Sequence, residues 1–240
     1  MYLRHAAAVR AEHPDLIAGG LYTEGITAEP DLSARVAAYT AVADARLADS
    51  SEAQLPPIQA WRRAFARMGL KPTQYRCAAE SLLRRYRKQG ELPRLHPLVD
   101  LANAVSVAFA IPVAVLDVAR IAEHLEVRPA DGDETYLSFA GDIEHPEPGE
   151  IVFADAARHA HARRWTYRQS AHSAVRVDTD AVLIVAEAMH DTAAADVTYL
   201  IETLAAELAF VWSVKPTTAI LDHPSSCFEF TPPSDGYAVE

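Results

Sequence analysis

The chain has 240 residues, half of them hydrophobic, and a formal net charge of −11 at pH 7. This length and composition allow a substantial buried core, in one large domain or two small ones. No apolar run reaches the roughly 20 residues that cross a bilayer, which excludes a membrane-spanning helix, and residues 1–15 lack the apolar core of a signal peptide. We therefore expect a cytoplasmic protein in which Cys77 and Cys227 are reduced thiols.

The first half of the chain is expected to form one strand followed by helices. The apolar run at 16–26, which glycines interrupt, predicts a strand with a bulge. The spacing of apolar residues predicts four helices: 31–47, Pro56 to just before Gly69, 73–88, and 98–110, which Pro112 stops.

The second half is richer in predicted strands. Short apolar segments, separated by turn-forming sequences, predict strands at 125–129, 135–139, 151–154, 181–188 and 217–221. A helix is expected over 193–212, and a loosely ordered tail after Pro224. Residues 131–134 predict a tight acidic turn in which Gly132 has a positive φ. Because helices and strands do not alternate regularly, we predict an α+β fold with residues 1–240 in a single domain.

Positive charge is concentrated in two windows of this acidic chain. Residues 62–94 contain ten Lys or Arg and two acids, and residues 158–176 contain five Arg and no acid, so these windows hold 15 of the 22 basic residues. A local positive surface can bind phosphate groups while the whole molecule stays acidic. Charge alone leaves open whether these arginines bind a polyanion or only solvate two helix faces.

The polar residues give no metal or cofactor signature. The ten histidines show no spacing typical of a metal site, and no glycine-rich phosphate loop is present. His159 and His161 are interpreted as a solvent-facing pair. We therefore expect no metal and no cofactor.

One polar ridge is expected on the predicted helix 98–110. Asp100, Asn103 and Ser106 are spaced by three and lead into the turn at Pro112. Such a ridge can line a pocket, where Asn103 offers two donors and one acceptor, or it can brace the neighbouring backbone.

Several motifs resemble the B3/B4 domain of the phenylalanyl-tRNA synthetase beta subunit, which removes the wrong amino acid from a charged tRNA. Asn103, Pro112 and Asp117 stand at the family's spacing, and the segment PGEIVFAD at 148–155 continues the likeness. The run RRWTYRQS at 163–170 is similar to stand-alone members. The resemblance covers about 58–190 and implies a B3/B4-type sheet core with packed helices, onto which the N-terminal strand and helix and the C-terminal helix and strand pack.

The resemblance implies hydrolysis of the 3′-terminal ester of aminoacyl-tRNA. It implies that Asn103 and Ser106 hold the aminoacyl group or the ribose, and that Glu134 braces the pocket. In the family a histidine stands where this chain has Ala114, which implies a roomier pocket for a different amino acid. The family's glutamate corresponds to Glu187, two residues late but on the same strand face as the expected position. With Gln169, it is expected to orient the ester or the water.

The two basic windows receive RNA roles in this interpretation. Arg164 and Arg168 are expected to hold terminal phosphates. Trp165 or Tyr167 can stack on the terminal adenine, and Trp165 is the residue we expect to do so. The acceptor stem is expected to contact Arg62, Arg63, Arg67, Lys71, Arg84, Arg85 and Lys88.

Two alternatives remain open from the sequence. One is a non-catalytic tRNA-binding module that lost the histidine, and the other is a sensor of free amino acids. The basic clustering at 62–94 favours RNA, because a small ligand does not require it. The amino acid, the tRNA and the oligomeric state do not follow from these residues.

Overall fold

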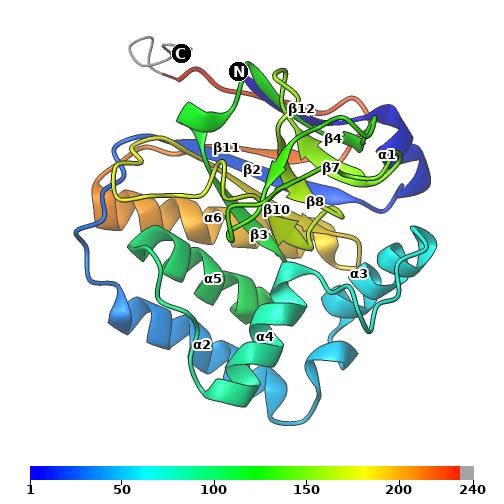
Figure 1. Ribbon diagram of the computed structural model, residues 1–240. Helices are drawn as coiled ribbons and strands as arrows, with labels where there is room; N and C mark the ends of the chain where they lie inside the picture. The colour runs from blue at the N-terminus through cyan, green and yellow to red at the C-terminus, as the bar shows by residue number, and fades with distance from the viewer. Residues whose placement is uncertain (233–240) are drawn as a thin grey trace.

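Two large β-sheets and six α-helices form the part of the chain that the structure describes, residues 1–232 of this computed structural model (Figure 1). One sheet is antiparallel and contains, in order, β11 (Thr217–Leu221), β2 (Ile17–Thr23), β10 (Val182–Ala188) and β3 (Val113–Asp117). The other contains, in order, β12 (Cys227–Glu229), β1 (Tyr2–His5), β4 (His124–Pro129), β7 (Ile151–Ala154), β8 (Ala160–Arg163) and β9 (Arg168–Gln169). A hairpin is formed by β5 (Tyr136–Leu137) and β6 (Ile143–Glu144).

Most of the helices lie below the sheets in the view of Figure 1. The longest, α6 (Ala193–Trp212), packs on β2, β10 and β11 of the four-stranded sheet. Below it lie α5 (Pro97–Phe109), then α2 (Ser33–Leu47) and α4 (Ala78–Gln89). The remaining helices are α3 (Pro56–Arg67), which reaches β10, and α1 (Ala7–Glu12), which lies beside β4.

The alternation of side chains along β10 divides the core into two layers. Val182, Ile184 and Ala186 pack with α5 and α6, whereas Leu183 and Val185 pack in the other layer, with side chains of the six-stranded sheet. Successive side chains of a strand point to opposite faces, so Glu187 shares the face of Val185 and points between the two sheets. Val185 and Glu187 therefore lie on the same face of the strand, as expected.

The glycines of β2 permit close packing rather than a bulge. The register of β2 with β10 is continuous from Ile17 to Thr23. A Cβ at Gly19 would lie 2.3 Å from a side-chain atom of Ile201 in α6, and one at Gly20 would lie 2.6 Å from the ring of Phe228 in β12. Glycine is thus required on both faces of β2, where a helix and a second sheet approach the backbone.

The α+β class is confirmed. The helix α1 and the strands β1, β3, β6, β8 and β9 were not expected, and two further segments differ from the prediction. α4 begins at Ala78 rather than at 73, because the backbone N–H of Tyr75 bonds back to the carbonyl of Lys71 and closes a turn first. The tail after Pro224 contains a strand, since β12 pairs with β1 and Phe228 is buried. The end of that tail, 233–240, lies outside the described residues.

Both thiols are free, as expected. Cys77 is buried, which raises the pKa of its thiol to about 12, and Cys227 is exposed. Across residues 1–232, every helix falls short of the length or apolar content that a bilayer crossing needs.

Candidate functional site

A pocket opens between the two large sheets, where the segment after α5 meets the segment after β8. The cavity is small, about 50 Å³, and opens to the surface. The lining residues come from both sheets and from the first residue of α4: Ala78, Pro112, Val113, Ala114, Phe153, Ala162, Trp165, Thr166, Tyr167, Arg168, Gln169, Val185 and Glu187. Residues 112–114, which follow α5, and residues 165–169, which follow β8, thus line one hollow. A direct hydrogen bond joins them, from the side-chain nitrogen of Gln169 to the carbonyl of Val115 at 2.7 Å.

The turn after β8 has an unusual backbone that directs Trp165 inward. Arg164 and Trp165 have φ angles of 46° and 60°, in the left-handed region that few residues other than glycine adopt. Two hydrogen bonds hold this turn, from the Arg164 N–H to Glu150 Oε1 (3.0 Å) and from the Trp165 N–H to the Ile151 carbonyl (2.7 Å). The neighbouring Arg163 is buried and donates two further bonds to the Glu150 carboxylate, at 2.9 Å each.

Glu187 is a buried carboxylate at the pocket wall that is held by donors from two directions. His5 Nε2 lies 2.6 Å from Oε1, and the indole N–H of Trp165 lies 3.0 Å from both carboxylate oxygens. The Nδ1 of His5 lies 3.3 Å from the guanidinium of Arg10, which can only donate, so Nδ1 accepts and Nε2 carries the proton. Glu187 therefore accepts a hydrogen bond from each of these donors.

Ala114, where the B3/B4 resemblance would imply a histidine, lies on the same pocket wall. Ala114 pairs with Val185 across β3 and β10, and both line the hollow. The methyl group of Ala114 leaves space here that a larger side chain would fill.

Comparison with known proteins gives a family and a related fold. The B3/4 domain model matches residues 60–208, more than half of the chain. The chain belongs to the B3/4 domain family. The N-terminal fragment of the phenylalanyl-tRNA synthetase beta-subunit from Pyrococcus horikoshii is similar, with a TM-score of 0.50, 8% identity and coverage of 89% of this chain and 49% of the fragment. At this identity the likeness concerns the fold, and the chain spans about half the length of that fragment. No curated protein sequence matches it.

The B3/4 match confirms the family that the sequence motifs indicated. It includes every residue that lines the pocket, whereas His5 and Arg10 belong to the N-terminal segment outside it. Five of the expected site residues line the hollow: Ala114, Trp165, Arg168, Gln169 and Glu187. No sequence motif pointed to His5 or Arg10, because only the pairing of β1 with β4 buries that segment.

Two expected substrate-binding residues of α5 lie elsewhere in the B3/4 domain. Asn103 is half-buried and is not part of the pocket lining. Ser106 is buried, and its hydroxyl donates to the carbonyl of Ile111 at 2.6 Å. The structure thus gives Ser106 a role in bracing the turn before Pro112, in place of the expected contact with the aminoacyl group.

Trp165 lies in the core and not on an accessible surface where it could stack on adenine. Its indole is fully buried and meets the ring of Trp61 edge-on, at 5.0 Å between centroids, and that of His13 at 4.8 Å. Stacking of an adenine on Trp165 is not supported, because neither ring face is exposed. The indole instead forms part of the inner wall and holds Glu187.

Glu134 braces a turn outside the pocket lining. Its carboxylate accepts the backbone N–H groups of Asp131 and Gly132 at 3.0 Å each and lies 2.6 Å from Arg128 Nη1. Burial raises the pKa of this carboxyl, but those donors outweigh burial and lower it to about 2. Gly132 has a φ of 103°, as predicted for this turn.

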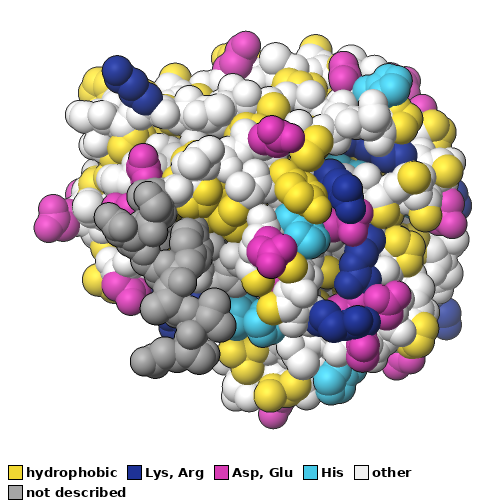
Figure 2. Space-filling view, turned by 90° about the horizontal axis from the view of Figure 1, so that it is seen from above, with side chains coloured by type: hydrophobic (Ala, Val, Ile, Leu, Met, Phe, Trp, Pro, Cys, Tyr) yellow, Lys and Arg dark blue, Asp and Glu magenta, His cyan; other side chains and the backbone are white. Residues whose placement is uncertain are grey.

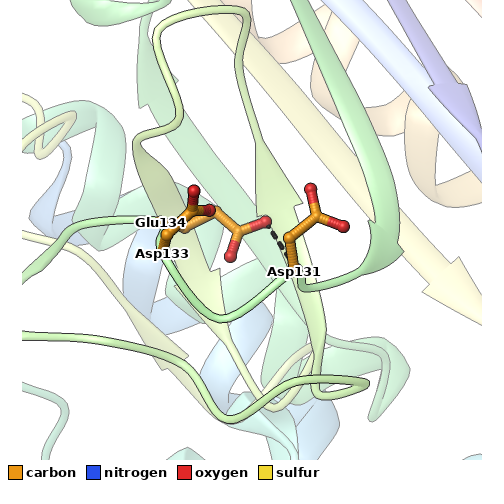
Figure 3. A group of neighbouring side chains, drawn as sticks. All are labelled: Asp131, Asp133 and Glu134. Atoms are coloured by element: carbon orange, nitrogen blue, oxygen red, sulfur yellow. Dashed lines mark hydrogen bonds between the residues drawn. The ribbon is translucent and has the colours of Figure 1, made fainter.

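Three carboxylates gather at this turn, as Figure 3 shows. Asp131 and Asp133 pair with Arg158, and Glu134 pairs with Arg128. The two arginines offset much of this negative charge, and the cluster stabilises the turn.

Four of the seven expected RNA-binding residues form bonds within the molecule, two of them with carboxylates. Arg62 lies 2.5 Å from the buried Glu80, and Arg84 lies 3.7 Å from the buried Glu52. Two further members make other internal bonds, Arg67 to the Glu12 carbonyl and Arg85 to the Gln89 side chain. Within residues 1–232, the remaining members are exposed and form no ion pair: Arg63, Lys71 and Lys88.

Basic and acidic side chains are also mixed on the face of the molecule that Figure 2 shows. Figure 2 shows Lys and Arg in a band right of centre on the face seen from above, with Asp and Glu among them. The described residues therefore form no continuous positive surface on this face.

The histidines near β8 form a cluster in which His161 is buried and His159 is partly exposed, so these two are not the expected solvent-facing pair. His161 is fully buried, with Nδ1 at 2.8 Å from Ser173 Oγ and Nε2 at 3.2 Å from Asp155 Oδ2. The rings of His159 and His172 stack at 4.2 Å. The residue types of Asp155, His161 and Ser173 are those of a hydrolytic triad, but the buried Ser173 hydroxyl cannot meet a substrate.

Proposed function

We propose that this B3/4 protein is a trans-editing deacylase, which hydrolyses the ester between an amino acid and the 3′-terminal adenosine of a mischarged tRNA. The observation that carries this proposal is the hollow between the sheets, with the carboxylate of Glu187 fixed in its wall. The fold likeness to a phenylalanyl-tRNA synthetase fragment supports tRNA as the partner.

The pocket residues can support hydrolysis by positioning. Water adds to the ester carbonyl carbon, the bond from that carbon to the ribose oxygen breaks, and the ribose hydroxyl leaves with a proton while the amino acid leaves as a carboxylate. An ionised Glu187 can accept a hydrogen bond from the attacking water and take up its proton. Gln169, fixed by its bond to Val115, can orient the ester beside it. An aminoacyl ester is already activated, so orientation supplies much of the rate enhancement.

The same pocket gives a basis for selection. Ala114, Val185 and Phe153 provide an apolar wall for the amino-acid side chain. A side chain that does not fit is retained on the tRNA, as in a second sieve. Arg168 lies at the pocket with 39% of its side chain exposed, 3.5 Å from Glu144, and can contact a terminal phosphate.

The test is deacylation of a panel of mischarged tRNAs by the purified protein, measured as release of labelled amino acid. We expect hydrolysis of at least one substrate. Glu187→Gln should slow it about 100-fold or more, since general-base catalysis contributes about 10²–10⁴-fold. The matched control, Glu202→Gln on the exposed face of α6, should retain the wild-type rate.

Background rates throughout would reject the enzyme. Salt-sensitive tRNA binding without turnover would then indicate a non-catalytic tRNA-binding module. Stabilisation by free amino acid without tRNA binding would indicate a sensor.

A further inference from the structure

Three side chains form a cluster beside the pocket. The guanidinium of Arg164 lies 4.9 Å from the ring centroid of Tyr75 and 6.0 Å from that of Tyr167. The two tyrosine rings meet edge to face at 5.3 Å, with an interplanar angle of 79°. All three residues are partly exposed, and Tyr167 also lines the pocket. The cluster is therefore an accessible surface continuous with the pocket.

The backbone conformation that places Arg164 in this cluster is unfavourable for a residue with a side chain. Arg164 has a φ of 46°, in the left-handed region that suits glycine and strains a residue with a side chain. The turn buries Trp165 and turns the neighbouring Arg164 outward, onto the tyrosine rings.

The charge of Arg164 is only weakly offset. Its nearest carboxylate is Glu150, at 4.0 Å, and that carboxylate already accepts two hydrogen bonds from Arg163. A cation with spare donors and two aromatic rings is a combination that binds an unpaired nucleotide, through stacking and phosphate contacts.

Tyr75 links this surface to the basic helices. It lies in the turn between α3 and α4, which also carries the exposed Lys71. A strand of RNA that leaves the pocket over Tyr167 and Tyr75 would thus continue towards Lys71.

We infer that Tyr75, Arg164 and Tyr167, the rim platform, stack the unpaired 3′ nucleotides of tRNA while the aminoacyl ester lies in the pocket. This inference rests on the proposed function and gives Tyr75 a role in it. The buried Trp165 is thereby replaced by partly exposed tyrosines as the stacking partner.

The test measures the affinity of the protein for uncharged tRNA and for the same tRNA without its three 3′-terminal nucleotides, by fluorescence anisotropy at fixed low salt. Wild type should bind the complete tRNA more tightly. Tyr75→Ala should weaken binding of the complete tRNA about 10-fold and leave binding of the shortened tRNA unchanged. Tyr75→Phe should retain wild-type affinity because it keeps the ring, as should Tyr199→Ala on the outer face of α6.

Arg164→Gln is the second variant, and it serves if Tyr75→Ala does not fold. It should weaken binding of the complete tRNA. It should also reduce the slope of log Kd against the logarithm of the salt concentration by about one. Wild-type affinity in both folded variants would overturn the platform and leave the proposed function standing. Failure of the wild-type protein to bind either tRNA would overturn both.

Discussion

At the scale of single residues, the adjacent Arg163 and Arg164 differ sharply in their surroundings. Arg163 is 5% exposed in its side chain and bonds to Glu150 and Glu144, both within the fold. Arg164 lies on tyrosine rings at the pocket rim. The first arginine stabilises the fold, and the second offers its charge to a ligand.

This difference predicts opposite effects of one substitution at the two positions. Arg163→Leu should reduce the free energy of unfolding by about 3–5 kcal/mol, because it leaves the carboxylate of Glu150 buried without its partner. Arg164→Leu should change it by less than about 1 kcal/mol. Urea unfolding of both variants measures this, and an equal loss of stability would contradict the separate roles.

The sequence could predict where the site is but not how each side chain is used. The spacing from Asn103 to Pro112 and the run around Trp165 correctly indicated the two segments that meet. A tryptophan among arginines suggests a stacking surface, but its burial depends on Trp61 and Glu187, which approach from distant parts of the chain. For the same reason the sequence did not indicate His5, because its contact with Glu187 joins residues 182 positions apart.

At the scale of elements, the turn between α5 and β3 positions the pocket wall at Pro112 and Ala114. The hydroxyl of Ser106 closes this turn through its bond to the Ile111 carbonyl. Because that bond is buried and local, Ser106 acts on stability and not on the substrate.

Ser106→Ala should therefore lower the free energy of unfolding by about 1 kcal/mol, the usual contribution of one hydrogen bond. The affinity for uncharged tRNA should not change. Chemical unfolding and anisotropy titration check the two parts. Unchanged stability combined with lost tRNA affinity would return Ser106 to the substrate site.

Local periodicity was sufficient for most of the helices and insufficient for several strands. The helices α2 and α6 lie within two residues of their expected bounds, since each carries a long apolar stripe. Strands β1, β3, β6, β8, β9 and β12 were not expected. They have two to five residues, and pairing with neighbouring strands, more than local preference, stabilises them.

At the scale of the whole molecule, the distribution of charge in the sequence overstated the positive surface. The window 62–94 contains ten basic residues, but four of them neutralise the buried Glu52 and Glu80. The sequence gives the positions of the arginines but not the carboxylates with which they pair in the fold. The positive surface available to a ligand is therefore smaller than the sequence suggested.

The histidine cluster predicts how stability depends on pH. Burial, and then the neighbouring His159 and His161, lower the pKa of His172 from 6.5 to about 4, while Asp155 opposes the shift. The unfolded chain thus takes up a proton between pH 6.5 and 4 that the folded chain does not. Stability should be full above about pH 6.5 and fall by about 1–2 kcal/mol as the pH drops towards 4.

Urea unfolding from pH 7 to pH 4 measures this loss, with His172→Gln as the control. The variant should lose less stability over the same range, because it lacks the titrating ring. A loss equal to that of wild type would show that His172 does not cause it.

The most direct test of the pocket as the place of hydrolysis is to fill it. Ala114→Phe should occupy the hollow beside Val185, and the matched control Ala157→Phe adds the same ring to an exposed position. Single-turnover deacylation of a mischarged tRNA that the wild type hydrolyses should fall to background in Ala114→Phe, persist in Ala157→Phe, and leave the affinity for uncharged tRNA unchanged in both. Hydrolysis at the wild-type rate by a folded Ala114→Phe protein would contradict the account.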